Sequence, residues 1–223
     1  IYRAAGPAHW NVKSFNNHWG VPLTLARMPE DTERAVFEIG MSTPGEIAPR
    51  SHMVRPHIGI ITCIAGAHLE GLGSLEGVAN EKSDIFAGME AGGTFILPAD
   101  DAFLDHLSAR ARELCPTGNR ETFGFAEDAT ARVTGYESNG VTSRITVEVI
   151  GQSVSVEIEA VGKHWALNVA AALLAASQTG RSLADCAEAL SGYSPPPGRG
   201  TAERLPLPQG GHFTLVDDAY NAN

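Results

Sequence analysis

Three side chains of the kinds that handle metal ions and phosphate lie near strand-like runs in the first half of the chain. Glu38 lies at the carboxyl end of one apolar run, His68 lies just beyond the next, and Lys82 comes fourteen residues later. In an open parallel sheet, ligands bind outside the carboxyl ends of the strands, so Glu38 and His68 would share one crevice. A carboxylate and an imidazole can bind a divalent cation that also contacts phosphate oxygens. With Lys82, these residues predict a magnesium-dependent phosphoryl-transfer centre.

Each of these residues also has an ordinary structural interpretation. A glutamate that ends a strand is often a solvated or helix-capping group, and a loop histidine often binds nothing. Lys82 could be a surface lysine that pairs with Glu81, an interaction of little energetic value. If Lys82 instead faces the crevice and is partly desolvated, a fraction of the molecules carry it as the neutral amine. A neutral amine can take up carbon dioxide and form a carbamate, which is an oxygen ligand for magnesium.

Two further polar segments are candidates for binding a substrate. Asn16-Asn17 and Gly20–Thr24 form a polar loop near the amino end, whose amides either hold a substrate or only shape the turn. His164 and Asn168 are four residues apart on a predicted helix and therefore lie on one face of it. The same spacing also fits a capped helix with an alanine-rich seam.

Short apolar runs alternate with helical patterns through the first half of the chain. The runs that indicate strands are Arg34–Gly40, His57–Ile64 and Thr94–Pro98. The helical patterns cover Pro44–Met53, Leu75–Met89 and Asp101–Leu114. Apolar, β-branched strands of this kind are typical of a sheet covered on both faces. The alternation predicts an α/β fold with a mostly parallel sheet flanked by helices.

The pattern changes in the second half. Ala131–Ala160 alternates polar and β-branched residues around Ser138-Asn139-Gly140, which predicts an antiparallel β excursion. Helices are predicted at Lys163–Thr179 and Ser182–Ser191. The Pro/Gly-rich linker that follows contains Arg199, which is either a phosphate clamp or a solvated residue.

We expect one domain over residues 1–197, and a linker with the first strand of a second domain over residues 198–223. Because the chain opens on Ile1 and closes on Asn223, both ends look cut from a longer protein. The predicted last strand, His212–Asp217, would then lack its own domain. We expect it to be loosely ordered or paired with the sheet edge of another molecule.

Composition excludes several classes of partner. A formal charge of −10 provides neither the counterion release needed for duplex nucleic acid nor a polybasic stripe for an anionic membrane. Three dispersed cysteines indicate reduced thiols in a cytoplasmic protein, not a disulfide framework or a zinc site. No run of 18 apolar residues predicts a membrane span.

Six strings resemble, in order and spacing, those of the Mur ligases of peptidoglycan synthesis. They are SFNNHWGVPLTL (14–25), VFEIGMSTPGEIA (36–48), AGAHLEGLGSLEGVANEKSDIF (65–86), GKHWALNVAAALLAA (162–176), PGRG (197–200) and VDDAYNAN (216–223). The first and last are most similar to the members that add D-alanyl-D-alanine to UDP-N-acetylmuramoyl-tripeptide. The resemblance implies the central ATPase-type domain of that family and a cytoplasmic location.

The resemblance also implies an ATP-dependent, ADP-forming amide ligase. A peptide carboxylate would attack the γ-phosphate of ATP to give an acyl phosphate, and the amine of D-alanyl-D-alanine would then displace phosphate. Lys82 matches a catalytic, carbamylated lysine, and it would bind Mg²⁺ together with Glu38 and His68. Asn17 matches a substrate-contacting asparagine, and Thr24 lies in the same string.

Residues of the second half match the nucleotide side of the family's site. His164 and Asn168 match catalytic positions there, and Asn168 also matches a nucleotide-binding one. Arg199 matches a phosphate-contacting arginine. Asp218 and Asn221 match the adenosine-binding segment. The strings carry no information on oligomeric state.

The sequence departs from the family at three points. The phosphate-binding G-x-x-G-K-[ST] loop of the family lies upstream of the first string, and the chain begins too late to contain it. Most of the amino- and carboxy-terminal domains are absent too, so we expect the isolated chain to be inactive. Trp165 replaces a common asparagine. The alternatives are a ligase with another amino-acid or polyglutamate acceptor, and a non-catalytic nucleotide-binding domain.

Overall fold

A computed structural model describes residues 1–66 and 69–220. The chain forms two compact units, one of Tyr2–Thr122 and one of Ile1 with the residues from Phe123 onward. The boundary falls inside strand β5 (Asn119–Gly124). This boundary differs from the predicted domain division after residue 197, which stays a prediction.

The first unit, Tyr2–Thr122, contains a parallel pair and part of a larger sheet. Strand β1 (Ala8–Trp10) pairs in parallel with β2 (Arg34–Val36), and β3 (Ile58–Ile60) pairs in parallel with β4 (Thr94–Pro98). The larger sheet has the strand order β3-β4-β5-β6-β7-β8. The helical elements are η1 (Tyr2–Ala5), α1 (Gly20–Ala26), α2 (Ile47–Val54), α3 (Leu69–Leu72), α4 (Leu75–Ser83), η2 (Asp84–Phe86) and α5 (Leu104–Leu114).

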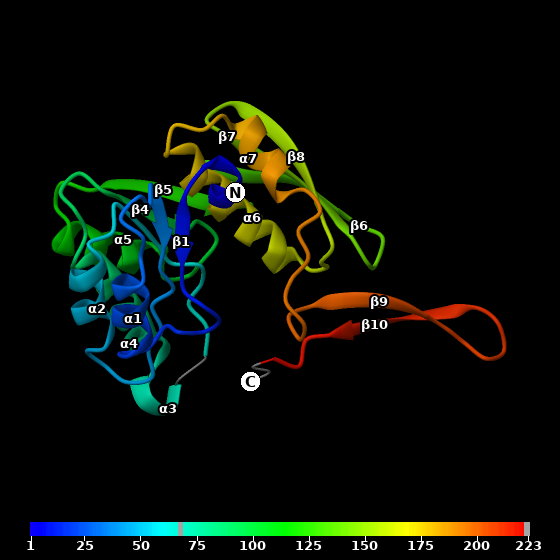
Figure 1. Ribbon diagram of the computed structural model, residues 1–223, viewed down its shortest axis with the longest axis horizontal. Coiled ribbons are helices and arrows are strands. Elements are labelled where there is room, and N and C mark those ends of the chain that lie inside the picture. Colours follow the sequence, from blue (N-terminus) through cyan, green and yellow to red (C-terminus); the bar gives the residue numbers. More distant parts are fainter. Residues whose placement is uncertain (67–68, 221–223) are drawn as a thin grey trace. The chain divides into compact units, whose positions relative to one another are not determined.

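The core of this unit lies between β4 and helices α4 and α5 (Figure 1). Phe86 and Phe95 are fully buried with ring centroids 5.7 Å apart, and burial of each stabilises the fold by about 2 kcal/mol. Helix α5 buries Leu107 and Ala111, which are four residues apart and therefore share one face. This core holds α4, which carries Lys82, and Ile61 of the segment after β3.

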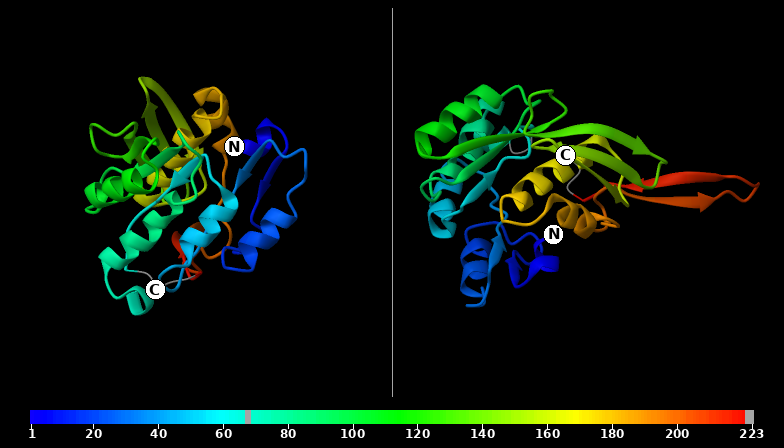
Figure 2. Two further views of the ribbon diagram at one scale, coloured as in Figure 1. Left: turned by 90° about the vertical axis from the view of Figure 1, so that its left-hand side faces the viewer. Right: turned by 90° about the horizontal axis from the view of Figure 1, so that it is seen from above.

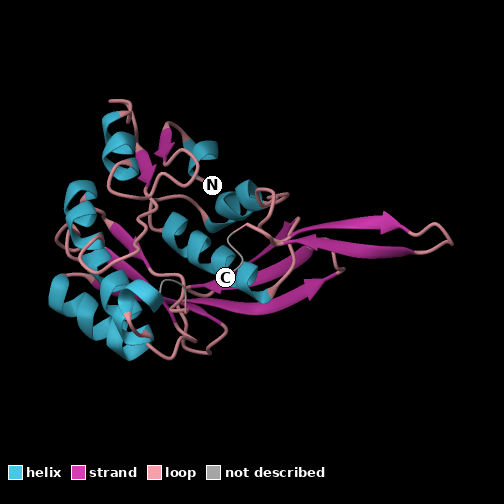
Figure 3. Ribbon diagram, turned by 90° about the horizontal axis from the view of Figure 1, so that it is seen from below, coloured by secondary structure: helices cyan, strands magenta, loops and turns pink. Residues whose placement is uncertain are grey.

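The second unit contains an antiparallel meander with a parallel start. Strand β5 pairs in parallel with β6 (Ala131–Ser138), and β6, β7 (Ser143–Val149) and β8 (Gln152–Ile158) pair antiparallel in sequence order. Alternate residues of β7 are buried, as expected for a strand with one covered face. Helices α6 (Lys163–Ser177) and α7 (Leu183–Leu190) pack on these strands, as the helices and strands of Figure 3 show. The predicted α/β fold with an antiparallel excursion is confirmed.

The prediction for His212–Asp217 was wrong in its pairing. This segment forms β10, which pairs antiparallel with β9 (Thr201–Pro206) of the same chain. The two strands extend away from the meander in the right-hand view of Figure 2. The turn between them ends in Gly210 and Gly211, whose φ angles of +88° and +86° suit glycine and bring the strands together. All six residues of β10 are exposed, so the hairpin is paired but not packed.

Three further expectations need correction. The sequence predicts that the strand before Glu38 and the 57–64 run share one sheet. In the structure, the strand before Glu38 is β2, which pairs with β1 in a separate two-stranded sheet. Residues 20–24, predicted as a loop, begin helix α1. The predicted helix over 75–89 ends at Ser83 and tightens into η2. Within the described residues, no helix is long and apolar enough to cross a membrane.

Candidate functional site

Glu38 is fixed just after β2 by a buried asparagine. Its backbone N–H donates to Asn11 Oδ1 at 2.7 Å, and Asn11 Nδ2 donates to the Glu38 carbonyl at 3.2 Å. Asn11 is 8% exposed, so these bonds are shielded from water. Because its amide side chain satisfies both backbone groups of Glu38, it takes the place of a strand partner where the β1–β2 ladder ends.

The carboxylate of Glu38 is exposed and is oriented by an asparagine. Asn16 Nδ2 donates to Glu38 Oε1 at 2.7 Å, and Asn16 O accepts from the backbone N–H of Gly40 at 2.9 Å. A Cβ at Gly40 would lie 2.8 Å from the Asn16 amide, so only glycine allows this approach. An exposed carboxylate that is oriented by a neutral amide has the chemistry of a ligand for a cation.

Lys82 lies in the last turn of α4 and reaches back to the end of β3. Its Nζ donates to the carbonyl oxygen of Cys63 at 2.7 Å. The segment after β3 is held by Asp101, whose Oδ2 accepts from the backbone N–H of Ile64 at 2.8 Å. The amine is therefore directed at the carboxyl-terminal end of a parallel strand, where α/β sheets bind ligands.

In the structure, the side chains of Lys82 and Glu81 bond to other partners and not to each other. Glu81 is 5% exposed, and its carboxylate accepts three backbone N–H groups at the start of α2, namely those of Gly45, Glu46 and Ile47, at 2.7 to 2.9 Å. A carboxylate in this position complements the positive end of the helix dipole. The Glu81 carboxylate is thus directed at α2, and the Lys82 amine at Cys63.

The predicted convergence of three metal ligands stays a prediction. Glu38 and Lys82 belong to the same compact unit, whereas His68 lies outside the described residues. Within residues 1–66 and 69–220, no three His, Cys, Asp or Glu side chains gather as a metal site. The two described members fit a magnesium site in their chemistry, because one is an exposed carboxylate and the other an amine that a carbamate would convert into an oxygen ligand.

Asn17 and Thr24 shape helix α1 in this structure. Asn17 Oδ1 accepts from the backbone N–H groups of Trp19 and Gly20 at 3.1 and 2.9 Å, which starts the helix. The Thr24 hydroxyl donates to the Gly20 carbonyl at 2.8 Å, and Thr24 is buried. A Cβ at Gly20 would lie 2.3 Å from the backbone of Phe15. The predicted substrate roles of Asn17 and Thr24 stay predictions, and these bonds account for both residues without a ligand.

In the second unit, His164 and Asn168 are exposed and lie one turn apart on α6, as their spacing predicted. Trp165 lies beside them, with its ring centroid 5.6 Å from that of His164 and 5.6 Å from that of Tyr193. The indole N–H of Trp165 is buried, and among the described residues it has no hydrogen-bond partner. A Cβ at Gly200 would lie 3.3 Å from that nitrogen.

Arg199 and Asp218 belong to two short segments that are hydrogen-bonded together. Gly200 N–H donates to the Asp217 carbonyl and Tyr220 N–H donates to the Gly198 carbonyl, both at 2.8 Å. The Arg199 guanidinium lies 4.5 Å from the centre of the Tyr220 ring, a cation–π arrangement. Asn221 lies outside the described residues.

Aromatic residues of this cluster were missed by sequence reasoning. Burial raises the pKa of the Tyr193 phenol, and the positive charge of Arg199 acts in the opposite direction. Tyr193 and Tyr220 are 39% and 52% exposed, so each ring is partly open to solvent beside the group that it contacts. Trp165 and Tyr220 lie in quoted strings, but without a predicted role in binding, and no local pattern points to Tyr193.

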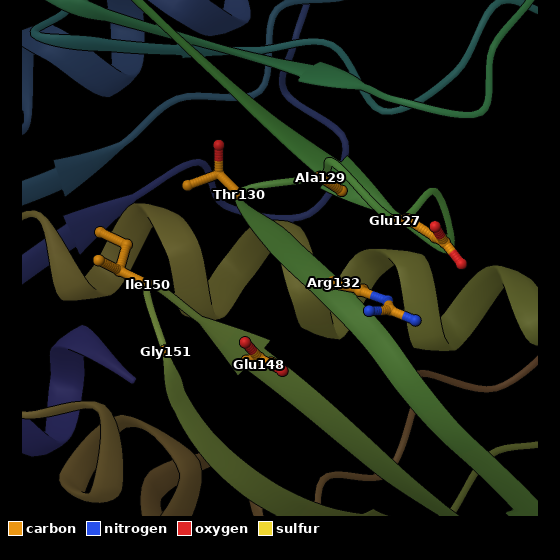
Figure 4. A pocket seen from close by; sticks show the side chains of 7 residues that line it. All are labelled: Glu127, Ala129, Thr130, Arg132, Glu148, Ile150 and Gly151. Carbon is orange, nitrogen blue, oxygen red and sulfur yellow. The ribbon is translucent and has the colours of Figure 1, made fainter.

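A shallow depression of about 240 Å³ lies elsewhere in the second unit (Figure 4). Its polar lining comes from residues near the turns of the meander, namely Glu127, Thr130, Arg132 and Glu148. No predicted site residue lines it. We therefore locate the candidate site by its hydrogen-bonded side chains and not by this depression.

Comparison with known proteins gives a consistent result. The family described as the Mur ligase middle domain matches residues 2–176. A UDP-N-acetylmuramoyl-tripeptide–D-alanyl-D-alanine ligase of Bacillus subtilis is 33% identical over 216 residues, which is 96% of this chain and 44% of that protein. A crystal structure of MurF from Acinetobacter baumannii is 27% identical with a TM-score of 0.88, over 99% of this chain and 46% of that one.

A more distant structure shows a likeness of fold alone. MurF ligase from Thermotoga maritima, in complex with ADP, has a TM-score of 0.84 at 21% identity, over 100% of this chain and 49% of that one. The chain therefore spans about half the length of the proteins that it matches.

Proposed function

Because this chain belongs to the Mur ligase family, we propose that it supplies the central part of an ATP-dependent, ADP-forming amide ligase. The proposed reaction adds D-alanyl-D-alanine to UDP-N-acetylmuramoyl-tripeptide in peptidoglycan synthesis. The relative from Bacillus subtilis, whose name states this reaction, supports the choice. The observation that carries the proposal is the placement of Lys82. Its amine donates to the carbonyl of Cys63 in the segment after β3, while the carboxylate of its neighbour Glu81 accepts from α2.

The proposed chemistry has two steps. A carboxylate oxygen of the tripeptide attacks the γ-phosphorus, and the bond to ADP breaks. The amine of D-alanyl-D-alanine then attacks the acyl carbon, inorganic phosphate leaves with that carboxylate oxygen, and the amine proton passes to solvent or a base. Positioning and neutralisation of phosphate charge supply most of the rate enhancement in such transfers.

Glu38, His68 and Lys82 are the residues we assign to a magnesium ion. Bound there, the ion would neutralise charge on the phosphate oxygens. The Nζ of Lys82 donates to Cys63 O, and a carbamate of Lys82 keeps one N–H on this nitrogen. The observed hydrogen bond is therefore compatible with both the amine and the carbamate.

We assign the nucleotide to the second unit. His164 and Asn168 are exposed on α6, and Arg199 and Asp218 lie in segments bonded to each other. Arg199 would contact phosphate, because guanidinium groups bind phosphate oxygens in pairs. Asn221 completes the proposed adenosine-binding set. ATP and a UDP-linked substrate place the proposed enzyme in the cytoplasm.

The test measures phosphate release by the gene product that contains this chain, with ATP, Mg²⁺, UDP-N-acetylmuramoyl-tripeptide and D-alanyl-D-alanine. We expect Lys82→Arg, which keeps the charge but cannot form a carbamate, to lower kcat by about 100-fold or more. Glu38→Gln should lower it similarly, because the carboxylate is lost. Lys13→Arg and Glu76→Gln change exposed residues of the same types and should leave kcat unchanged.

Other outcomes of this assay would contradict the proposal. Full activity of Lys82→Arg would exclude an essential carbamate at this position. A preference for another amino acid or for glutamate as the amine donor would favour a related ligase with that acceptor. Nucleotide binding with no turnover by any donor would favour a non-catalytic domain.

A further inference from the structure

A buried carboxylate links the helix of Lys82 to the helix that follows Glu38. Glu81 precedes Lys82 on α4, and its two oxygens accept the N–H groups of Gly45, Glu46 and Ile47 across 34 to 36 residues of sequence. A buried carboxylate is costly unless its lone pairs are satisfied, so these bonds hold α2 firmly against α4.

A buried guanidinium continues the connection toward Glu38. Arg50, one turn into α2, is 4% exposed. Its NH2 group donates to Glu46 Oε1 at 3.1 Å, and its NH1 group donates to the carbonyl oxygen of Gly40. Gly40 lies two residues after Glu38, so Arg50 fixes the chain immediately beyond the candidate ligand.

Glu38 is also bonded to the segment that contains Asn11 and Asn16. Asn16 binds both the Gly40 N–H and the Glu38 carboxylate, and Asn11 binds the Glu38 backbone. An unbroken series of hydrogen bonds and short backbone segments therefore runs from the Lys82 helix through Glu81 and Arg50 to Glu38. Buried charged side chains that are hydrogen-bonded in this way favour one arrangement of the backbone.

We propose that Glu81 and Arg50 are positioning residues that set the place of Glu38 relative to Lys82. Neither residue contacts the substrate or the metal in this proposal. The inference rests on the proposed function, because Glu38 and Lys82 act as partners only if they share a ligand. Residues that orient metal ligands without binding the metal alter metal affinity or activity by about 10- to 100-fold when changed.

The first test measures the clamp itself and needs no activity. In Glu81→Gln, one acceptor oxygen becomes an NH₂ group that faces a backbone N–H. We expect the amides of Gly45, Glu46 and Ile47 to exchange hydrogen about tenfold faster or more, with the amides of α5 unchanged. Unchanged exchange at these three amides would overturn the inference, whatever the activity of the enzyme.

Arg50→Lys, which cannot donate to Gly40 and Glu46 in the same fork geometry, tests the second link if Glu81→Gln does not fold.

The second test separates positioning from general damage. We expect Glu81→Gln to raise the apparent KM for Mg²⁺ by about tenfold, with little change in the KM for D-alanyl-D-alanine. Glu76→Gln, an exposed change on the same helix, should alter neither value. Equal effects on both KM values, or no effect on either, would contradict a positioning role. If the unsubstituted protein forms no amide, the proposed function fails, while the exchange experiment still decides whether the clamp exists.

Discussion

At the scale of single residues, the candidate site depends on polar side chains that bond to backbone groups. The Asn11 and Glu81 side chains each satisfy backbone groups that secondary structure leaves unpaired. Their importance was not visible in the sequence, because the bonds of Asn11 and Glu81 join residues 27 to 36 positions apart. A sequence pattern reports neighbours along the chain, whereas these bonds depend on how separate segments fold together.

Glu46 gives a prediction about pH at this scale. Hydrogen bonds from the backbone N–H groups of Ser42 and Thr43, and then the interaction with Arg50, hold the pKa of Glu46 below its ordinary value of 4.5. A lowered carboxyl pKa in the folded state stabilises the fold above the ordinary pKa, and this contribution is lost as pH falls through the folded pKa. We expect Glu46→Gln to lower the free energy of unfolding at neutral pH.

The measurement is urea unfolding of both proteins across the acid range. The difference between them should be largest near neutral pH and should shrink as pH falls below 4.5. A difference that stays constant with pH would show that packing of the side chain, and not its charge, is responsible.

At the scale of elements, the regular parts of the fold were predicted and the irregular ones were not. The strand at Thr94–Pro98 has the predicted bounds, and α6 begins at the predicted residue. Strand β1 is not predicted, because its three residues are too few to show a period-two pattern. Strand β9 is not predicted, because Pro206 and the glycines before the strand indicate a loop. Helix α1 was read as a loop because Gly20 and Pro22 are turn residues. Its start is instead determined by Asn17 and by the close approach of Gly20 to Phe15.

The turn between β7 and β8 contains a strained residue. Val149 pairs with Gln152, so Ile150 and Gly151 form a two-residue turn with φ angles of +48° and +74°. Such turns favour Asn-Gly, because a β-branched residue is strained at positive φ. Ile150 is also 76% exposed, so it gains little from burial.

We expect Ile150→Asn to raise the free energy of unfolding by about 1 kcal/mol. Ile150→Val keeps the β-branch and should give no such gain. Both are measured by urea or thermal unfolding. Equal stability of all three proteins would indicate that the turn carries no strain.

At the scale of the whole molecule, the family could be recognised from the sequence but the geometry of the site could not. Six strings in register span most of the chain, and the Mur ligase middle domain matches residues 2–176. Family membership predicted the fold and the candidate positions. The bonds from Lys82 to Cys63 and from Glu81 to α2 required the structure, because they join segments that no single string contains.

The described candidate residues are divided between the two compact units. Glu38 and Lys82 lie in the unit of Tyr2–Thr122, and His164, Arg199 and Asp218 lie in the other. In our proposal the first group binds the metal and the second binds the nucleotide. The chain spans about half the length of the proteins named above, and the complete reaction is our proposal for the gene product that contains it.

The central claim is that this gene product joins a carboxylate to an amine through an acyl phosphate, with Lys82 required. The most direct measurement uses UDP-N-acetylmuramoyl-tripeptide labelled with ¹⁸O in its reacting carboxylate, and analyses the phosphate released with D-alanyl-D-alanine and ATP by mass spectrometry. We predict that each phosphate carries one ¹⁸O atom from the carboxylate. We also predict that Lys82→Arg lowers the rate of labelled phosphate release by about 100-fold or more, while Lys13→Arg leaves that rate unchanged. Release of unlabelled phosphate, or a rate of labelled phosphate release that Lys82→Arg leaves unchanged, would contradict the account.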